Sequence, residues 1–109
     1  MAKSDFFEKV YAVVAQIPEG KVTSYGAIAK AIGAARSSRT VGYAMNACAK
    51  LDQDIPAHRV VNRNGVLTGK HHFPGQHTMQ RLLEEEGLVI ENDTIKNFKN
   101  CFWQPTENE

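Results

Sequence analysis

Two short amphipathic segments, joined by a tight, glycine-containing connection, restrict the possible folds of this chain more than any other feature. The first covers residues 25–32, and the hydroxyls of Thr23 and Ser24 can cap its start. The second follows a capping serine at Ser37 or Ser38, and its apolar residues recur at helical spacing. These residues are Val41, Ala44, Met45 and Cys48. Two short helices connected in this way predict a helix-turn-helix.

The outward face of the second segment has an unusual composition for a helix. It carries Arg39, Thr40, Gly42, Tyr43 and Asn46. A glycine in a helix interior costs about 1 kcal/mol relative to alanine. We interpret this cost as compensated by the close approach of another surface. Small residues leave room for such a surface, and basic residues can bind it if it is negatively charged.

The formal net charge of +1 conceals a strong segregation of charge along the chain. Residues 21–81 contain nine Lys and Arg but two Asp, a balance of +7, whereas residues 82–109 carry −5 and residues 1–20 carry −1. Phosphate binding requires positive charge concentrated in this way, because each neutralised phosphate releases condensed counterions. Charge alone fits a solvated basic face equally well.

Periodicity and turn residues predict one domain over residues 1–109, a length that suits a single modest core. A first helix, capped by Asp5, is expected to run until Pro18 stops it. The pair Asn64-Gly65 predicts a hairpin turn between strands at residues 59–62 and 66–68. This hairpin would form a short two-stranded β wing.

The last predicted helix ends at Gly87, and the tail beyond it is apolar enough to pack back onto the domain. The apolar tail residues are Phe98, Phe102 and Trp103. The expected fold is therefore a mainly α, winged helix-turn-helix DNA-binding domain, which we expect to act as a monomer.

Several function classes are not favoured by the sequence. No stretch approaches the roughly 18 to 20 consecutive apolar residues of a membrane span, so we expect a cytoplasmic protein with no membrane partner. Cys48 and Cys101 lie far apart and form no CxxC pair, which predicts free thiols. His71, His72 and His77 lack the helical spacing of metal ligands, so we expect neither a metal nor another cofactor.

Five short strings occur in one particular order and spacing. They are Ile17-Pro18-Glu19-Gly20-Lys21-Val22, Ser24-Tyr25-Gly26, Arg39-Thr40-Val41-Gly42, Pro56-Ala57-His58-Arg59-Val60 and Glu86-Gly87. Together they resemble the DNA-binding domain of the O6-alkylguanine-DNA alkyltransferases. The resemblance covers residues 6–87 and leaves residues 88–109 as a C-terminal tail.

Ala57 stands where the resemblance places the reactive cysteine, whose thiolate removes the alkyl group from guanine O6 in one irreversible displacement. That displacement requires an activated nucleophile, and alanine offers none, so we expect no enzymatic activity. His58 and Glu86 align with the pair that activates the family's cysteine. Here we expect them to form a structural hydrogen-bonded pair. The helical spacing of Cys48 predicts a buried thiol that does not replace the missing one.

The resemblance also implies roles in DNA binding. Arg39 aligns with the arginine that replaces an extruded nucleotide in the DNA stack, and Tyr25 with the tyrosine that helps to rotate the target's phosphate. Lys70 stands where active members usually have a pocket tyrosine, so we expect a cationic wall beside the purine. The complete set of expected DNA- and lesion-binding residues is Tyr25, Arg39, Gly42, Ala57, Arg59, Val60 and Lys70.

In these features the chain resembles the alkyltransferase-like proteins, a branch of the family that lacks the cysteine. The resemblance implies a non-enzymatic damage sensor that flips O6-alkylguanine out of double-stranded DNA, binds it, and marks it for nucleotide excision repair proteins. Two alternatives remain. A helix-turn-helix regulator would read undamaged sequence through polar base-edge contacts, and an enzyme in which His58 activates water would remove the alkyl group.

Overall fold

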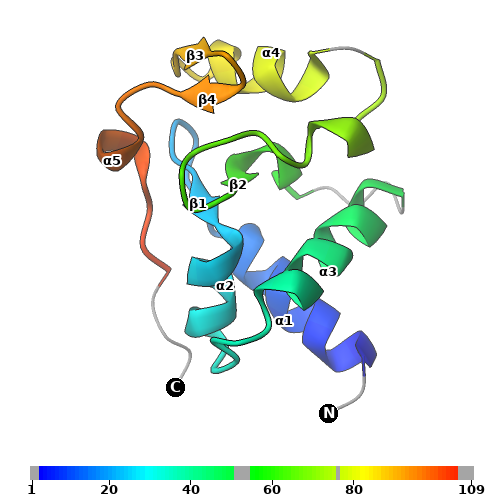
Figure 1. Ribbon diagram of the computed structural model, residues 1–109. Helices are drawn as coiled ribbons and strands as arrows, with labels where there is room; N and C mark the ends of the chain where they lie inside the picture. Colours follow the sequence, from blue (N-terminus) through cyan, green and yellow to red (C-terminus); the bar gives the residue numbers. More distant parts are fainter. Residues whose placement is uncertain (1–2, 51–54, 76, 106–109) are drawn as a thin grey trace.

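Helices dominate the protein, whose structure is a computed structural model that describes residues 3–50, 55–75 and 77–105. Within these residues the helices are α1 (Lys3–Val14), α2 (Tyr25–Ala31), α3 (Ser38–Lys50), α4 (Thr78–Glu85) and α5 (Phe98–Cys101). The strands are β1 (Thr23–Ser24), β2 (Val60–Val61), β3 (Ile90–Glu91) and β4 (Thr94–Ile95). Two single 3-10 turns, η1 (Ala57–Arg59) and η2 (Lys70–His72), complete the regular structure. Figure 1 shows α1, α2 and α3 grouped together, with α4, β3 and β4 at the other end.

The predicted helix-turn-helix is confirmed in α2 and α3. The Ser24 hydroxyl oxygen accepts a hydrogen bond from the Ala27 backbone N–H at 3.1 Å and so caps α2. The chain leaves α2 through Gly33, whose φ of 78° suits a residue without a Cβ. A short connection then leads into α3, which packs against α2 and α1.

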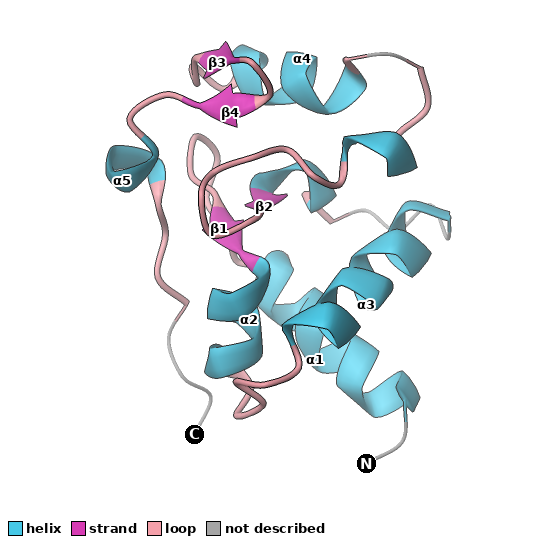
Figure 2. Cartoon of the chain, in the orientation of Figure 1, coloured by secondary structure: helices cyan, strands magenta, loops and turns pink. Residues whose placement is uncertain are grey.

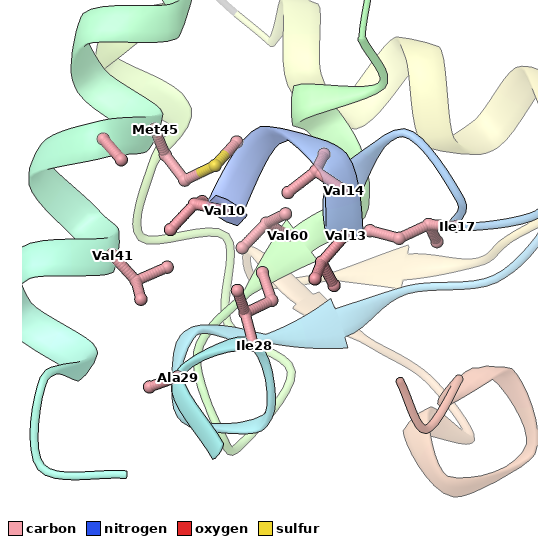
Figure 3. Close-up of a cluster of buried hydrophobic side chains, with 10 residues drawn as sticks. Val10, Val13, Val14, Ile17, Ile28, Ala29, Val41, Met45 and Val60 are labelled. Carbon is pink, nitrogen blue, oxygen red and sulfur yellow. The ribbon is translucent and has the colours of Figure 1, made fainter. Parts of the chain in front are cut away.

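The apolar face of α1 forms the centre of the first hydrophobic cluster. Figure 3 shows this cluster, in which side chains from α1, α2, α3 and β2 meet. Its fully buried members include Val10, Val14, Ile28, Val41 and Ala44. The helix begins at Lys3, before the predicted cap at Asp5, and ends at Val14. A tighter turn then carries the apolar periodicity on to Ile17, which is 2% exposed.

The predicted wing is not formed by residues 59–62 and 66–68. The turn around Asn64-Gly65 is present, but β2 pairs in parallel with β1, matching Thr23 to Val60 and Ser24 to Val61. Successive side chains of a strand point to opposite faces. Val60 accordingly packs in the first cluster and Val61 in the second, so β2 is buried on both faces and is not half of an exposed wing.

The small antiparallel sheet lies further along the chain, in β3 and β4 (Figure 2). The turn between the two strands consists of Asn92 and Asp93, both with positive φ, as a tight hairpin turn requires. Together with α4 this hairpin covers the second cluster. The members of that cluster are Val22, Val61, Leu67, Met79, Leu83, Leu88, Ile90 and Ile95.

The C-terminal tail packs back onto the domain, as predicted. Phe98 lies against the second cluster and Trp103 against the first. The Trp103 N–H donates to the Val22 carbonyl at 2.7 Å, and the Val22 N–H donates to the Cys101 carbonyl at 2.9 Å. None of the described helices is long and apolar enough to cross a membrane.

Candidate nucleic-acid site

A cavity of about 520 Å³ opens between α3 and the two segments that carry η1 and η2. Its volume falls in the range of roughly 300–1,000 Å³ that is typical of small-molecule sites. The residues that line it are Tyr25, Ser38, Arg39, Gly42, Tyr43, Met45, Asn46, Ala57, Val60, Thr68, Gly69, His72, Phe73 and Met79. The cavity therefore brings together five separate stretches of the chain, from α2, α3, η1 with β2, the η2 segment and α4.

Five of the predicted lesion-binding residues line this cavity: Tyr25, Arg39, Gly42, Ala57 and Val60. Val60 is fixed by its pairing in β2, and Ala57 by the η1 turn that immediately precedes this strand. The wall is thus built on two elements that are anchored in the core.

The tyrosine of the cavity wall is held against the opposite loop. A Cβ placed on Gly69 would lie 3.1 Å from the Tyr25 hydroxyl oxygen, so glycine leaves just enough room for this hydroxyl. The contact joins the start of α2 to the loop before η2 and closes one side of the cavity.

The exposed start of α3 forms the rim. Arg39 is exposed in the first turn of the helix, and Gly42 follows one turn later. Apart from the adjacent residues and the backbone of the helix itself, no atom lies within 4 Å of the position that a Cβ on Gly42 would occupy. The helix surface therefore offers open space at this glycine, which agrees with the close approach expected from the sequence.

Lys70 does not line the cavity, contrary to the prediction that it forms a cationic wall. Its ammonium group donates to the Asp93 carboxylate at 2.5 Å, and both side chains are more than a third exposed. Gly69, His72 and Phe73 line the cavity from the η2 segment, whereas the ion pair with Asp93 holds the Lys70 ammonium group at the β3–β4 hairpin.

Arg59 also lies outside the cavity lining, although it was predicted to bind DNA. Its Nε and Nη2 atoms donate to the Glu86 carboxylate at 2.8–3.1 Å. The remaining Nη1 atom donates to the Ile17 carbonyl at 2.7 Å. These contacts place the guanidinium inside the domain, where it joins η1 to the end of α4 and the end of the first helical segment.

Glu86 is the centre of a nearly buried hydrogen-bond cluster. In addition to Arg59, it accepts from the Gly20 N–H at 2.8 Å, and the predicted hydrogen bond to His58 is present at 2.6 Å. Burial by itself raises the pKa of this carboxyl group, but hydrogen bonds from Arg59, Gly20 and His58 outweigh it. The pKa of Glu86 is lowered from 4.5 to about 2.

This cluster makes the stability depend on pH in the acid range. Because the pKa of Glu86 is lower in the folded protein, its contribution is complete above pH 4.5 and is lost as the pH falls towards 2. We expect the loss to amount to about 3 kcal/mol. Urea unfolding at a series of pH values would measure it. A Glu86→Gln variant should have a shallower pH dependence in this window, and equal slopes would contradict the assignment.

Several lining residues were not predicted to bind the lesion, and some of them left a signal in the sequence. Tyr43 and Asn46 lie on the same outward face of α3 as Arg39, so helical spacing alone could have included them. His72 and Phe73 left no such signal. They reach the cavity because the segment after β2 folds back over it, which no local pattern encodes.

Comparison with known proteins establishes the family. Residues 5–88 match the family model of the 6-O-methylguanine DNA methyltransferase, DNA binding domain. The chain belongs to this family. It is 34% identical over 109 residues to alkyltransferase-like protein 1 of Schizosaccharomyces pombe, a match that covers 96% of this chain and 100% of that protein. It is 40% identical over 106 residues to the DNA base-flipping protein of Escherichia coli, covering 94% of this chain and 78% of that protein.

Solved structures of family members share the fold. The crystal structure of S. pombe Atl1 in complex with damaged DNA containing O6-carboxymethylguanine gives a TM-score of 0.79 at 33% identity, covering 96% of this chain and 100% of that one. The structure of Mycobacterium tuberculosis OGT in complex with DNA gives 0.62 at 36% identity, covering 75% and 49%. The predicted fold class, a mainly helical DNA-binding domain, is confirmed by these likenesses.

The cavity offers no thiol nucleophile among its lining residues. Ala57 contributes a methyl group to the wall, and no thiol occurs among the lining residues. The side chain of Cys48 lies outside the described part of the structure, so its predicted burial stays a prediction. In the described ranges, no three His, Cys, Asp or Glu side chains are grouped to hold a metal ion.

Proposed function

We propose that this protein is a non-enzymatic DNA damage sensor, which binds O6-alkylguanine in duplex DNA and leaves the alkyl group in place. One observation carries this proposal: the cavity beside the exposed Arg39 is lined by the methyl group of Ala57, where the resemblance places the family's nucleophile. Two relatives that align with nearly the whole chain support it, since they are an alkyltransferase-like protein and a base-flipping protein. An S. pombe relative has been crystallised with O6-carboxymethylguanine in DNA.

The cavity can receive a base only if the nucleotide leaves the helical stack. Extrusion costs a few kcal/mol and is least costly for a base that pairs poorly, as an alkylated guanine does. Selectivity for the lesion therefore begins with the DNA itself. The cavity walls, provided by Tyr25, Ala57 and Val60, would then hold the extruded base.

The side chains around the cavity account for binding without reaction. Alkyl transfer needs an activated nucleophile within reach of the alkyl carbon. His58, which would activate a thiolate, instead shares the Glu86 carboxylate with Arg59 and has no neighbouring thiol in the described structure. The pair thus serves to connect η1 to α4.

A bound lesion that is not repaired must be passed on. We propose that the complex marks the site for nucleotide excision repair proteins, as the resemblance implies, and that the protein acts as a cytoplasmic monomer. Extracts that lack this protein but contain the excision repair proteins would test this step separately from lesion binding. Addition of the purified protein should increase excision at O6-methylguanine.

Equilibrium binding to matched duplexes tests the central proposal. We expect the protein to bind a duplex with one O6-methylguanine at least about tenfold more tightly than the guanine duplex, since the unstacking cost is smaller at the lesion. Both titrations require the same salt concentration, because non-specific affinity depends strongly on salt. A radiolabelled methyl group should remain on the DNA after incubation.

Each alternative predicts a different result in the same experiment. Equal affinity for the two duplexes would favour a general or sequence-reading helix-turn-helix protein. Loss of the label from the DNA would favour an enzyme that uses another nucleophile or water.

A further inference from the structure

Tyr43 is unusually exposed for a large aromatic side chain. Its relative exposure is 54%, and among the described residues Val89, at 58%, is the other exposed large hydrophobic residue. A large aromatic ring gains free energy by burial against an apolar surface. Tyr43 has no ring partner or hydrogen bond within the described structure, so its ring is free to contact another molecule.

The position of Tyr43 beside the proposed lesion site indicates that this molecule is DNA. The residue lies on α3 four positions after Arg39, so the two side chains are neighbours on one face of the helix. Both border the mouth of the cavity, and the open surface of Gly42 adjoins them. Val89 immediately precedes β3, and β3 lies with α4 at the end of the molecule away from α1 and α2 (Figure 1).

We propose that Tyr43 is a second stacking residue, whose ring packs against the unstacked base or sugar that flanks the extruded nucleotide. This proposal rests on the proposed function and identifies how the protein holds the gap in the duplex. Extrusion exposes the faces of the neighbouring bases, and base–aromatic stacking is tolerant of sequence because every base presents a π-face. Arg39 and Tyr43 would then cover two sides of the same gap.

The alternative position for the ring is within the cavity, against the extruded base itself. The two positions make different predictions for a duplex in which an abasic site replaces the lesion. Such a duplex has a gap but no base to occupy the cavity. A residue that stacks on the flanks should contribute equally to both duplexes, whereas a residue that contacts the extruded base should contribute to the lesion duplex alone.

The experiment compares four variants on O6-methylguanine, guanine and abasic duplexes of one sequence at fixed salt. We expect Tyr43→Ala to weaken binding to the lesion and abasic duplexes by about tenfold each, within the range measured for base–aromatic stacking. Tyr43→Phe keeps the ring and should stay within about twofold of the natural protein. Val89→Ala removes the other exposed hydrophobic side chain and should leave all three affinities unchanged.

The outcomes separate this inference from the proposed function. If the natural protein prefers the lesion and Tyr43→Ala matches Val89→Ala on every duplex, the stacking role is overturned while damage sensing stands. A loss confined to the O6-methylguanine duplex would also overturn it, in favour of contact with the extruded base. If the natural protein shows no preference for the lesion, the proposed function itself is wrong, whatever the Tyr43 variants do. A Tyr43→Leu variant, which keeps apolar volume without the π-face, should lose affinity as Tyr43→Ala does.

Discussion

Replacement of Glu86 by alanine is expected to lower the free energy of unfolding by about 3–5 kcal/mol at neutral pH. The carboxylate is 10% exposed and accepts hydrogen bonds from Arg59, His58 and the Gly20 N–H. Its removal would leave the Arg59 guanidinium, itself on a side chain that is 15% exposed, without a counter-charge. A nearly buried and unpaired charge is among the costliest single defects in a folded protein.

Urea unfolding monitored by circular dichroism would measure this loss as a shift of the midpoint at constant slope. Glu85→Ala is the matched control, because Glu85 is the exposed neighbour in the last turn of α4. We expect this control to change stability by less than about 0.5 kcal/mol. Equal and small effects of the two substitutions would mean that the Glu86 cluster contributes little to the fold.

The helical part of the fold could be predicted because its signals are local. A hydroxyl at Ser24 and a positive-φ glycine at Gly33 define the ends of α2 in the sequence and in the structure. Apolar spacing likewise identifies the buried face of α3, with Val41, Ala44 and Met45. Such features depend on residues within one or two turns, and tertiary contacts do not override them here.

The strand pairing could not be predicted because it depends on distant residues. Asn64-Gly65 correctly indicates a turn, but the turn does not determine which strand pairs with Val60 and Val61. Their partner, β1, lies almost 40 positions earlier in the chain. In a sequence, two adjacent valines are typical of a strand that is buried on both faces as well as of a wing strand. The hairpin that does form has its own signal in Asn92-Asp93, within the segment interpreted as a tail.

The candidate site was predictable only in part, because neither a family string nor a count of charges shows which side chains are already paired within the fold. Lys70 and Arg59 both contribute to the basic segment, yet each is paired in the structure, with Asp93 and Glu86 respectively. The partners are 23 and 27 positions away, so a sequence cannot show that these charges are already neutralised. Exposed Arg39 is a stronger candidate for DNA contact than either of them.

For this reason Arg39→Ala is expected to have the largest effect on DNA binding. An inserted guanidinium would replace the stacking of the extruded nucleotide, and unstacking costs a few kcal/mol. Loss of about 2–3 kcal/mol corresponds to roughly 30- to 150-fold weaker binding of the O6-methylguanine duplex. The guanine duplex, in which the base stays stacked, should lose only the contribution of one positive charge. The preference for the lesion should therefore largely disappear.

Arg36→Ala provides the matched control, since Arg36 is exposed in the connection before α3 and does not line the cavity. Loss of this positive charge should weaken binding to both duplexes equally and reduce its salt dependence. If Arg39→Ala behaves in this way too, Arg39 contacts phosphate and does not enter the stack. Arg39→Lys adds a second criterion, because lysine keeps the charge but lacks the planar group that stacks. Insertion predicts that lysine restores affinity for the guanine duplex and does not restore the preference for the lesion.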